Sequence, residues 1–179
     1  MRKQLWVYLR TILIAFVIAY AVRTLLFATY VVDGKSMEPT LHDGNLLMVN
    51  KVIYDWKDVN RFDVIVFHRN EQDDYVKRVI GIEGDSIEYK NDRLYVNGEF
   101  QEEAYLQPFR EEAVGKLTED FTLKEITGEA TIPKGYIFVM GDNRQRSLDS
   151  RKFGFVPIDL VVGKVDARYW PISQAAIAF

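Results

Sequence analysis

The stretch RFDVIVFHRNEQDDYVKRVIGIEGD, residues 61–85, contains two apolar, β-branched runs separated by polar residues. The runs are Val64 to His68 and Tyr75 to Ile82, and short runs of this kind bounded by turn residues are typical of antiparallel β strands. Within the second run, Lys77 and Arg78 stand among apolar neighbours. The stretch therefore predicts a mainly β domain and places a lysine in the middle of one strand.

Similar runs occur on both sides of this stretch, so few helices are expected after residue 31. Glycine-containing turns separate or follow the runs at residues 83–85, 97–98 and 141–143. Trp170-Pro171 is expected to end the last strand. The other predicted strands are Leu46 to Val52, Ser86 to Lys90, Arg93 to Val96 and Tyr136 to Met140.

The segment from about residue 97 to residue 132 differs from its surroundings, because charged residues dominate it and its hydrophobic periodicity is weak. It is predicted to be a smaller insertion that carries loops or a short helix. Pro133 and Gly135 then mark the return to strand structure.

The N-terminal segment is almost wholly apolar from Leu5 to Val32, and only Arg10 and Arg23 interrupt it. A spanning helix needs about 20 apolar residues, so the two arginines must extend toward opposite membrane interfaces. Further basic residues lie on the N-terminal side, which by the positive-inside rule places the N-terminus in the cytoplasm. We expect a single-pass anchor in the cell membrane at residues 1–28 and an extracytoplasmic domain at residues 29–179.

Two other interpretations of this segment stay open. A basic start, a short apolar run and the small-residue pattern Ala19-Tyr20-Ala21 also describe a cleavable signal peptide. A buried helix of a soluble protein is the third interpretation, but apolar residues on all sides and flanking arginines disfavour it.

Length and composition limit the number of domains and the classes of partner that the chain can have. A chain of 179 residues fits one compact domain with an appendage. The net charge of -3 and the pI near 5.5 disfavour a nucleic-acid partner, since phosphate recognition favours a basic surface. The sequence has no cysteine, which excludes disulfides and thiolate metal sites but leaves an extracytoplasmic location open.

Ser36 lies in GKSMEPTL, residues 34–41, where the flanking glycine and proline predict a tight, exposed bend. A serine hydroxyl is a poor nucleophile until a neighbouring base removes its proton. The chain has two histidines, His42 and His68, and both stand in surroundings typical of surface residues. Each is a possible base, although neither is favoured.

Lys77 is the stronger candidate base, because apolar side chains surround it at strand-like spacing. An ammonium group on a buried strand face loses hydration, which lowers its pKa and favours the neutral form that accepts a proton. A solvated strand lysine beside Arg78 is the simpler interpretation of these residues alone. Alternation does not decide which of the two side chains points inward.

Residues 140–154, MGDNRQRSLDSRKFG, concentrate charged and polar side chains in one turn-rich segment. Composition alone fits a solvated, salt-bridged loop or a calcium-type turn. The spacing does not match a twelve-residue calcium loop, and three arginines would repel a cation. We therefore expect no metal and no cofactor.

Together these motifs resemble the bacterial type I signal peptidases, a family of membrane-bound serine proteases with a Ser/Lys dyad. The resemblance implies the family's antiparallel β-sheet domain behind an N-terminal transmembrane helix. Lysine at position 77, a single anchor and a short insertion resemble the Gram-positive form, whereas archaeal and endoplasmic-reticulum relatives have histidine there. The matching segments, in order, are the anchor at residues 5–27, GKSMEPTL, GNLLMVNK, RFDVIVF through DYVKRVIGIEGD, and GDNRQRSLDSRKFG.

The resemblance implies a role for each matching residue. Ser36 corresponds to the nucleophile, Lys77 to the general base, and Ser147 to a hydroxyl that orients the lysine by a hydrogen bond. The residues implied to support the site are Asp142, Arg144, Asp149 and Arg151. Those implied to bind substrate, on strands that flank the two catalytic residues, are Val32, Asp33, Gly34, Met37, Asp74, Tyr75 and Val76.

One position departs from the family pattern. Some members have a serine two residues before the nucleophile, whose hydroxyl helps to stabilise the oxyanion, whereas this chain has Gly34. The Ser36 backbone N–H is expected to remain as one donor, and the second donor is unassigned. Removing one such donor from a site built around it costs about 100- to 1000-fold in turnover, so a substitute is expected.

The resemblance implies an endopeptidase that removes N-terminal signal peptides from translocated preproteins through an acyl-enzyme. The expected partners are preprotein signal peptides and the lipid bilayer, without nucleic acid, and this location also allows proximity to the secretion translocon. Two other functions stay open. A self-cleaving repressor-type Ser/Lys peptidase would carry a DNA-binding motif in place of the apolar segment, and a membrane-tethered β-rich binding module would have no need of Ser36 and Lys77.

Overall fold

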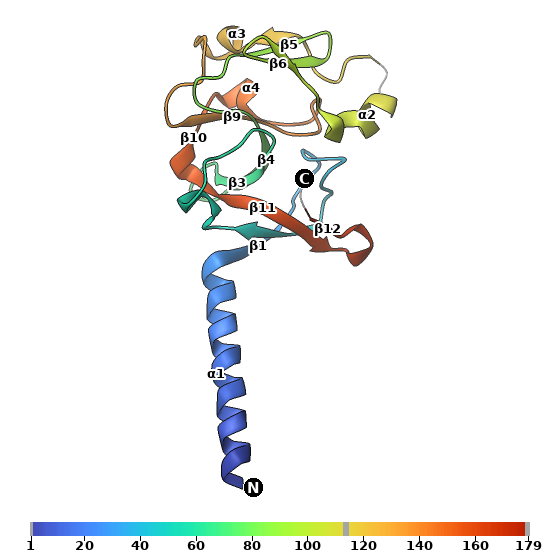
Figure 1. The fold of residues 1–179 in the computed structure, drawn as a ribbon. Helices are drawn as coiled ribbons and strands as arrows, with labels where there is room; N and C mark the ends of the chain where they lie inside the picture. The colour runs from blue at the N-terminus through green and yellow to red at the C-terminus, as the bar shows by residue number, and fades with distance from the viewer. Residues whose placement is uncertain (1, 113–114, 178–179) are drawn as a thin grey trace.

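The computed structural model describes residues 2–112 and 115–177, which form one long N-terminal helix and a β domain of two antiparallel sheets (Figure 1). The predicted fold class, mainly antiparallel β with an N-terminal apolar helix, is confirmed. The helices are α1 (Arg2–Leu26), α2 (Gln107–Glu112), α3 (Leu123–Thr127) and α4 (Ser150–Phe153). The strands are β1 (Phe27–Val31), β2 (Leu46–Asn50), β3 (Val64–His68), β4 (Asp74–Gly81), β5 (Ile87–Lys90), β6 (Arg93–Val96), β7 (Glu99–Gln101), β8 (Phe121–Thr122), β9 (Tyr136–Met140), β10 (Val156–Pro157), β11 (Val161–Trp170) and β12 (Ala176–Ile177).

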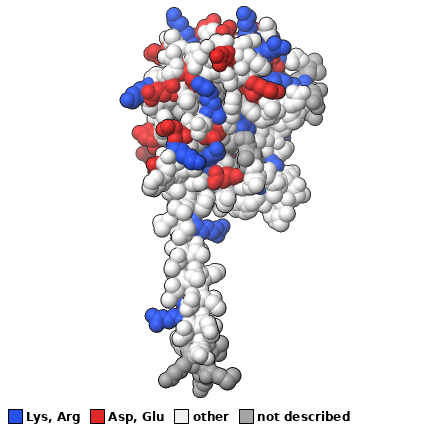
Figure 2. Space-filling model, in the orientation of Figure 1, with Lys and Arg blue, Asp and Glu red and all other residues white. Residues whose placement is uncertain are grey.

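Helix α1 stands apart from the β domain and is long and apolar enough, from Trp6 to Leu26, to cross a membrane. Figure 2 shows few charged side chains along it, whereas both signs of charge are spread over the β domain. The apolar run from Leu5 to Val32 is not a single element, because Phe27–Val31 pairs antiparallel with β2 and forms β1. The β domain therefore begins inside the segment predicted to be the anchor.

The larger sheet has the strand order β1-β2-β11-β3-β4-β9-β10, and β12 pairs with β11. Strands β3 and β9 have the bounds predicted from the sequence, and β4 is shifted by one residue. Strand β2 ends at Asn50 rather than Val52, because the chain turns there and Lys51 N–H donates to Leu26 O. Gly163 lets β11 pass close to this turn, since a Cβ there would lie 2.1 Å from Asn50 O.

The smaller sheet has the order β7-β6-β5-β8 and lies at the end of the molecule far from α1 (Figure 1). Two-residue turns join β5 to β6 and β6 to β7, with positive φ at Asn91, Asp92, Asn97 and Gly98 as such hairpins require. The turn predicted at residues 97–98 is confirmed. The segment predicted to be an insertion supplies β7 and β8 to a sheet that β5 and β6 begin, so it is continuous with the preceding strands.

Candidate active site

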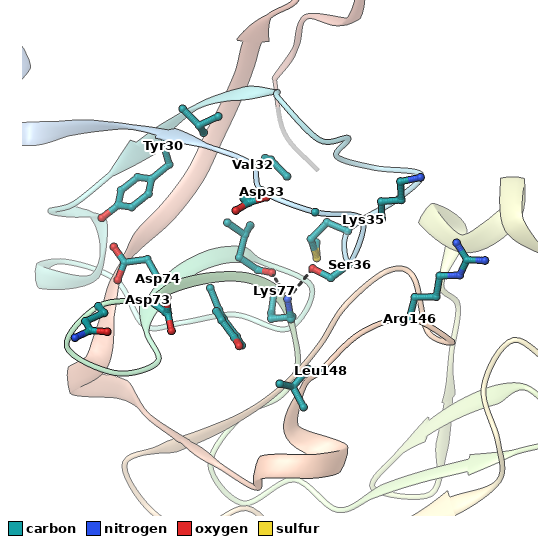
Figure 3. A pocket seen from close by; sticks show the side chains of 16 residues that line it. Tyr30, Val32, Asp33, Lys35, Ser36, Asp73, Asp74, Lys77, Arg146 and Leu148 are labelled. Atoms are coloured by element: carbon teal, nitrogen blue, oxygen red, sulfur yellow. Dashed lines mark hydrogen bonds between the residues drawn. The ribbon is translucent and has the colours of Figure 1, made fainter.

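Ser36 and Lys77 meet in the structure, although 41 residues separate them in the sequence (Figure 3). Lys77 Nζ lies 2.8 Å from Ser36 Oγ and donates a second hydrogen bond to Val76 O at 2.9 Å. Ser36 lies in the turn segment after β1, and Lys77 lies on β4 with 4% of its surface exposed. We call these two residues the dyad.

Backbone contacts on two sides hold the Ser36 turn in place. Gly34 has a φ of +88°, a conformation that glycine adopts without strain, and its N–H donates to Asp43 Oδ1 at 2.8 Å. Asn143 binds the other side of the turn, since its side chain donates to Lys35 O and its N–H donates to Ser36 O, both at 3.0 Å. The nucleophile candidate is therefore anchored to the 140–154 segment.

Burial changes the acid–base behaviour of Lys77. Loss of hydration lowers the pKa of its ammonium group from 10.5 to about 8, while the negative charges of Asp149 and Asp142 act in the opposite direction. The Tyr75 ring lies 5.1 Å from Nζ and adds apolar cover. A substantial fraction of Lys77 is therefore neutral near pH 8, as a proton acceptor must be.

Arg78, next to Lys77 on β4, is also buried, with 1% of its surface exposed. Alternation places the two side chains on opposite faces of the strand, and both faces are covered. Arg78 Nε and NH2 donate to the Asp142 carboxylate at 2.9 and 2.7 Å, and NH1 donates to Phe62 O at 2.9 Å. Lys77 and Arg78 are therefore both buried, on opposite faces of β4.

Asp149 organises the other end of the 140–154 segment. Its carboxylate accepts hydrogen bonds from Gly141 N–H at 3.0 Å and from Arg151 Nε and NH2 at 2.8 Å each. Burial raises the pKa of this carboxyl group, but its hydrogen bonds and its ion pair with Arg151 together outweigh burial and the net shift is downward. Arg151 also donates to Arg144 O at 2.7 Å, so the charged pair closes the segment on itself.

Arg144 belongs to a buried cluster that sequence reasoning missed. Its NH2 donates to Glu103 Oε1 at 2.6 Å, and the hydroxyls of Tyr89 and Tyr105 donate to the same oxygen at 2.7 and 2.8 Å. Glu103 follows the exposed Glu102 in a charged segment, and no local pattern distinguishes the two. Only the tertiary structure shows that one of them faces a buried guanidinium.

Ser147 lies close to the nucleophile turn. A Cβ on Gly141 would be 2.3 Å from Ser147 Oγ and 2.4 Å from Ser36 O, so this glycine is packed between the two serines. Ser147 Oγ is buried and has no hydrogen-bond partner in the described part of the chain. Its expected hydrogen bond to Lys77 is therefore not among the observed contacts, and the orienting role stays a prediction.

A cleft of about 410 Å³ opens beside the dyad. The residues predicted to bind substrate all line it, namely Val32, Asp33, Gly34, Met37, Asp74, Tyr75 and Val76. Val32 and Met37 are also buried in a hydrophobic cluster against which Val76 packs. These apolar side chains therefore serve the core and the cleft wall together.

Two strand edges without partners border this cleft. β1 pairs only with β2, which leaves its outer edge free of any strand that the structure describes. β9 pairs with β4 only from Arg78 to Gly81, so residues 74–77 have β3 on one side and no described strand on the other. Free N–H and C=O groups on such edges can pair with an extended peptide.

The two histidines lie away from this arrangement. His42 is exposed, and His68 Nδ1 lies 2.6 Å from Asp74 Oδ1 at the start of β4. Of the three candidate bases, Lys77 is the one whose side chain is hydrogen-bonded to Ser36 Oγ among the described residues. Within residues 2–112 and 115–177, no group of three or more His, Cys, Asp or Glu side chains is arranged to hold a metal ion.

A serine hydrogen-bonded to a buried lysine, beside free strand edges in an antiparallel β domain, has the geometry of a nucleophile–base pair in which lysine stands where many serine hydrolases have histidine. The family model "Signal peptidase, peptidase S26" matches residues 5–170. The chain belongs to this family of peptidases.

Individual relatives agree with the family match. The chain is 56% identical to Signal peptidase I of Bacillus caldolyticus, over 93% of this chain and 92% of that protein. It is 44% identical to Signal peptidase IB of Staphylococcus aureus, over 97% and 94% of the two chains. A crystal structure of a signal peptidase I from Enterococcus faecalis V583 superimposes with a TM-score of 0.58 at 44% identity, covering 61% of this chain and 97% of that one.

Proposed function

We propose that the protein is a membrane-bound serine endopeptidase that cuts N-terminal signal peptides from translocated preproteins, with Ser36 as nucleophile and Lys77 as general base. The observation that carries the assignment of roles is the 2.8 Å contact between Ser36 Oγ and the buried Lys77 Nζ. The relatives named signal peptidase support the reaction, since they match over nearly the whole chain.

The chemistry uses one base twice. Neutral Lys77 takes the Ser36 proton as Oγ attacks the scissile carbonyl carbon, and the resulting ammonium donates that proton to the leaving amine. The signal peptide is then held as an ester on Ser36. Water that gives a proton to Lys77 attacks this ester, and the proton returns to Ser36 Oγ as the acid is released. The Ser36 N–H is the proposed first donor to the oxyanion.

The neighbours of the dyad keep the lysine in place for both steps. Val76 O accepts one of its hydrogen bonds, and the buried charges of Asp142 and Asp149 keep its pKa from falling further. Ser147 is proposed to offer its buried hydroxyl to Nζ when the substrate is bound. Arg144 fixes the 140–154 segment to Glu103 and Arg151 closes the segment on itself, so that Asn143 can hold the Ser36 turn.

The cleft accounts for substrate selection. The end of the signal peptide would lie extended between β1 and residues 74–77, pairing with both free edges. Val32, Met37 and Val76 would form shallow apolar surfaces for small side chains at positions minus one and minus three. Helix α1 is proposed to span the membrane with its N-terminus in the cytoplasm, which places the cleft on the side where translocated preproteins emerge.

The test is cleavage in detergent of a preprotein with alanine at positions minus one and minus three, with the cut located by mass spectrometry. We expect the parent to cut after the minus-one alanine, and Ser36→Ala and Lys77→Ala each to lose at least about 1000-fold in kcat/KM. The exposed Lys134 provides the control, because Lys134→Ala removes an ammonium group outside the cleft.

Folding of each variant is checked by its thermal unfolding. Near-parental cleavage by a folded Lys77→Ala variant would show that Lys77 is not the base and would direct attention to His42. A folded parent that cuts none of several preproteins would favour the binding-module alternative.

A further inference from the structure

The charged side chains that line the cleft are separated by sign. Asp73 and Asp74 lie on one side of the dyad, and Asp33 lies toward the same side, whereas Lys35 and Arg146 lie on the other side (Figure 3). All five are exposed to solvent. The cleft therefore has an acidic end and a basic end, with the reacting atoms between them.

Among the side chains that the structure describes, none neutralises the basic end. Lys35 and Arg146 form no ion pair with the residues that the structure describes. At the acidic end, by contrast, Asp74 contacts His68 at 2.6 Å and Asp73 accepts a hydrogen bond from Asn70 at 2.9 Å. The two cations consequently present their charge to whatever occupies that part of the cleft.

The free strand edges indicate which part of a substrate reaches each end. Backbone pairing is available along β1 and along residues 74–77, and beyond Lys77 β9 occupies the edge of β4. The segment that must lie extended, up to the scissile carbonyl, therefore runs beside Asp74 and Val32. The chain that follows the scissile bond leaves this edge and continues past the dyad, over Lys35 and Arg146.

We infer that Lys35 and Arg146 form a recognition site for acidic residues at the start of the mature protein, so that preproteins with Asp or Glu just after the cleavage site are preferred substrates. This inference rests on the proposed function and adds a substrate class to it. Because both side chains are exposed, their effect is modest and falls with ionic strength.

The experiment uses the full chain in detergent and three preproteins that differ only at positions plus two and plus three, which are both glutamate, both glutamine or both lysine. We expect kcat/KM at low salt to follow the order glutamate, glutamine, lysine, with about a tenfold range for two cations acting on two charges. The range should shrink to about twofold near 0.5 M salt.

Charge reversal in the enzyme supplies the matched comparison. Arg146→Glu and Lys35→Glu should each narrow the range of kcat/KM among the three substrates or reverse their order. Lys134→Glu makes the same change in net charge at an exposed position outside the cleft, and it should keep the parental order.

The outcomes separate this inference from the function on which it rests. Equal cleavage of all three preproteins by the parent would overturn the recognition site and leave the proposed function intact. The recognition site is likewise overturned if Lys134→Glu changes the order as much as Arg146→Glu does, since net charge would then be the cause. If the parent cuts none of the three at the alanine site, the proposed function fails and this inference fails with it.

Discussion

The protonation state of Lys77 is the residue-level property on which the proposed chemistry depends. Burial lowers its pKa to about 8, which places the change from ammonium to amine within the range where enzymes can be assayed. Only the amine can accept the Ser36 proton. Below this pKa the active fraction falls by about tenfold for each pH unit, and above it the fraction approaches one.

The first prediction concerns this pH dependence. The kcat/KM of the parent should rise with pH, with a midpoint near 8, and then level off. Asp149→Asn removes a negative charge that raises the pKa of Lys77, so its midpoint should lie at lower pH than that of the parent. Asparagine can still accept the Gly141 hydrogen bond through its side-chain oxygen. Initial rates from about pH 6 to about pH 10 bracket both midpoints.

The exposed Asp159 gives the control for this comparison, and Asp159→Asn should keep the parental midpoint. A midpoint for Asp149→Asn that stays at the parental value or moves upward would contradict the electrostatic link between Asp149 and Lys77. A rate that does not change across this pH range would contradict the role of Lys77 as base.

At the level of elements, the site depends on how β9 ends. β9 runs beside β4 and stops at Met140, and Gly141 then packs against the turn that carries Ser36. A second glycine without space for a side chain, Gly81, ends β4 beneath the smaller sheet, where a Cβ would lie 2.6 Å from Ile87 Cδ1. The two glycines differ in what surrounds them, since one faces a fixed backbone oxygen and the other faces side chains that can move.

This difference predicts unequal effects on activity. Adding a methyl group at either glycine should lower the free energy of unfolding by about 1–3 kcal/mol. Gly141→Ala should also lower kcat/KM by about 100-fold, because the added methyl group displaces Ser36 O and with it the nucleophile. Gly81→Ala should keep kcat/KM within about twofold of the parent, because Ile87 and Ile132 can adjust without moving the dyad.

Both variants are compared by thermal unfolding and by kcat/KM measured well below either unfolding temperature. If Gly81→Ala and Gly141→Ala lose activity to the same extent, then general destabilisation explains the loss and the packing of Gly141 against Ser36 does not.

On the scale of the whole molecule, the protein consists of a β domain that forms its own hydrophobic clusters and a helix that takes no part in them. The three clusters draw their buried residues from Val32 onward, and α1 touches the domain mainly where it continues into β1. The helix therefore adds little to the stability of the β domain. Its proposed role is to hold the active site at the membrane.

Removal of residues 1–26 should leave the unfolding temperature of the β domain within about 2 °C of the parent, because it deletes almost no buried contact. The shortened protein should cleave a short soluble peptide at a near-parental rate. Cleavage of a membrane-inserted preprotein in liposomes should fall by at least about tenfold, since enzyme and substrate no longer share a surface. A large drop in unfolding temperature would show that α1 is part of the folded domain.

Local sequence patterns were sufficient for six of the twelve strands that the structure describes, whereas the dyad was identified through the family resemblance. Strands β3, β6 and β9 have the predicted bounds because their β-branched and aromatic runs are each closed by turn residues, and that signal is local. Ser36 and Lys77 were found because their motifs resemble those of a known family. The anchor was predicted to end at residue 28, whereas α1 ends at Leu26, because Phe27–Val31 has the composition of either a helix end or a strand and only pairing with β2 decides between them.

The sequence by itself determined the class of fold, the apolar N-terminal helix and the identities of the two residues proposed for catalysis. The tertiary structure alone decided that Lys77 and Arg78 are both buried, that Glu103 meets Arg144, and that residues 74–77 keep an edge beside β1 that no described strand occupies. The physical reason is that hydrophobic periodicity and turn chemistry act between neighbours in the chain. Burial of a charge and the pairing of an edge depend on segments that are distant in sequence and come together only when the chain folds.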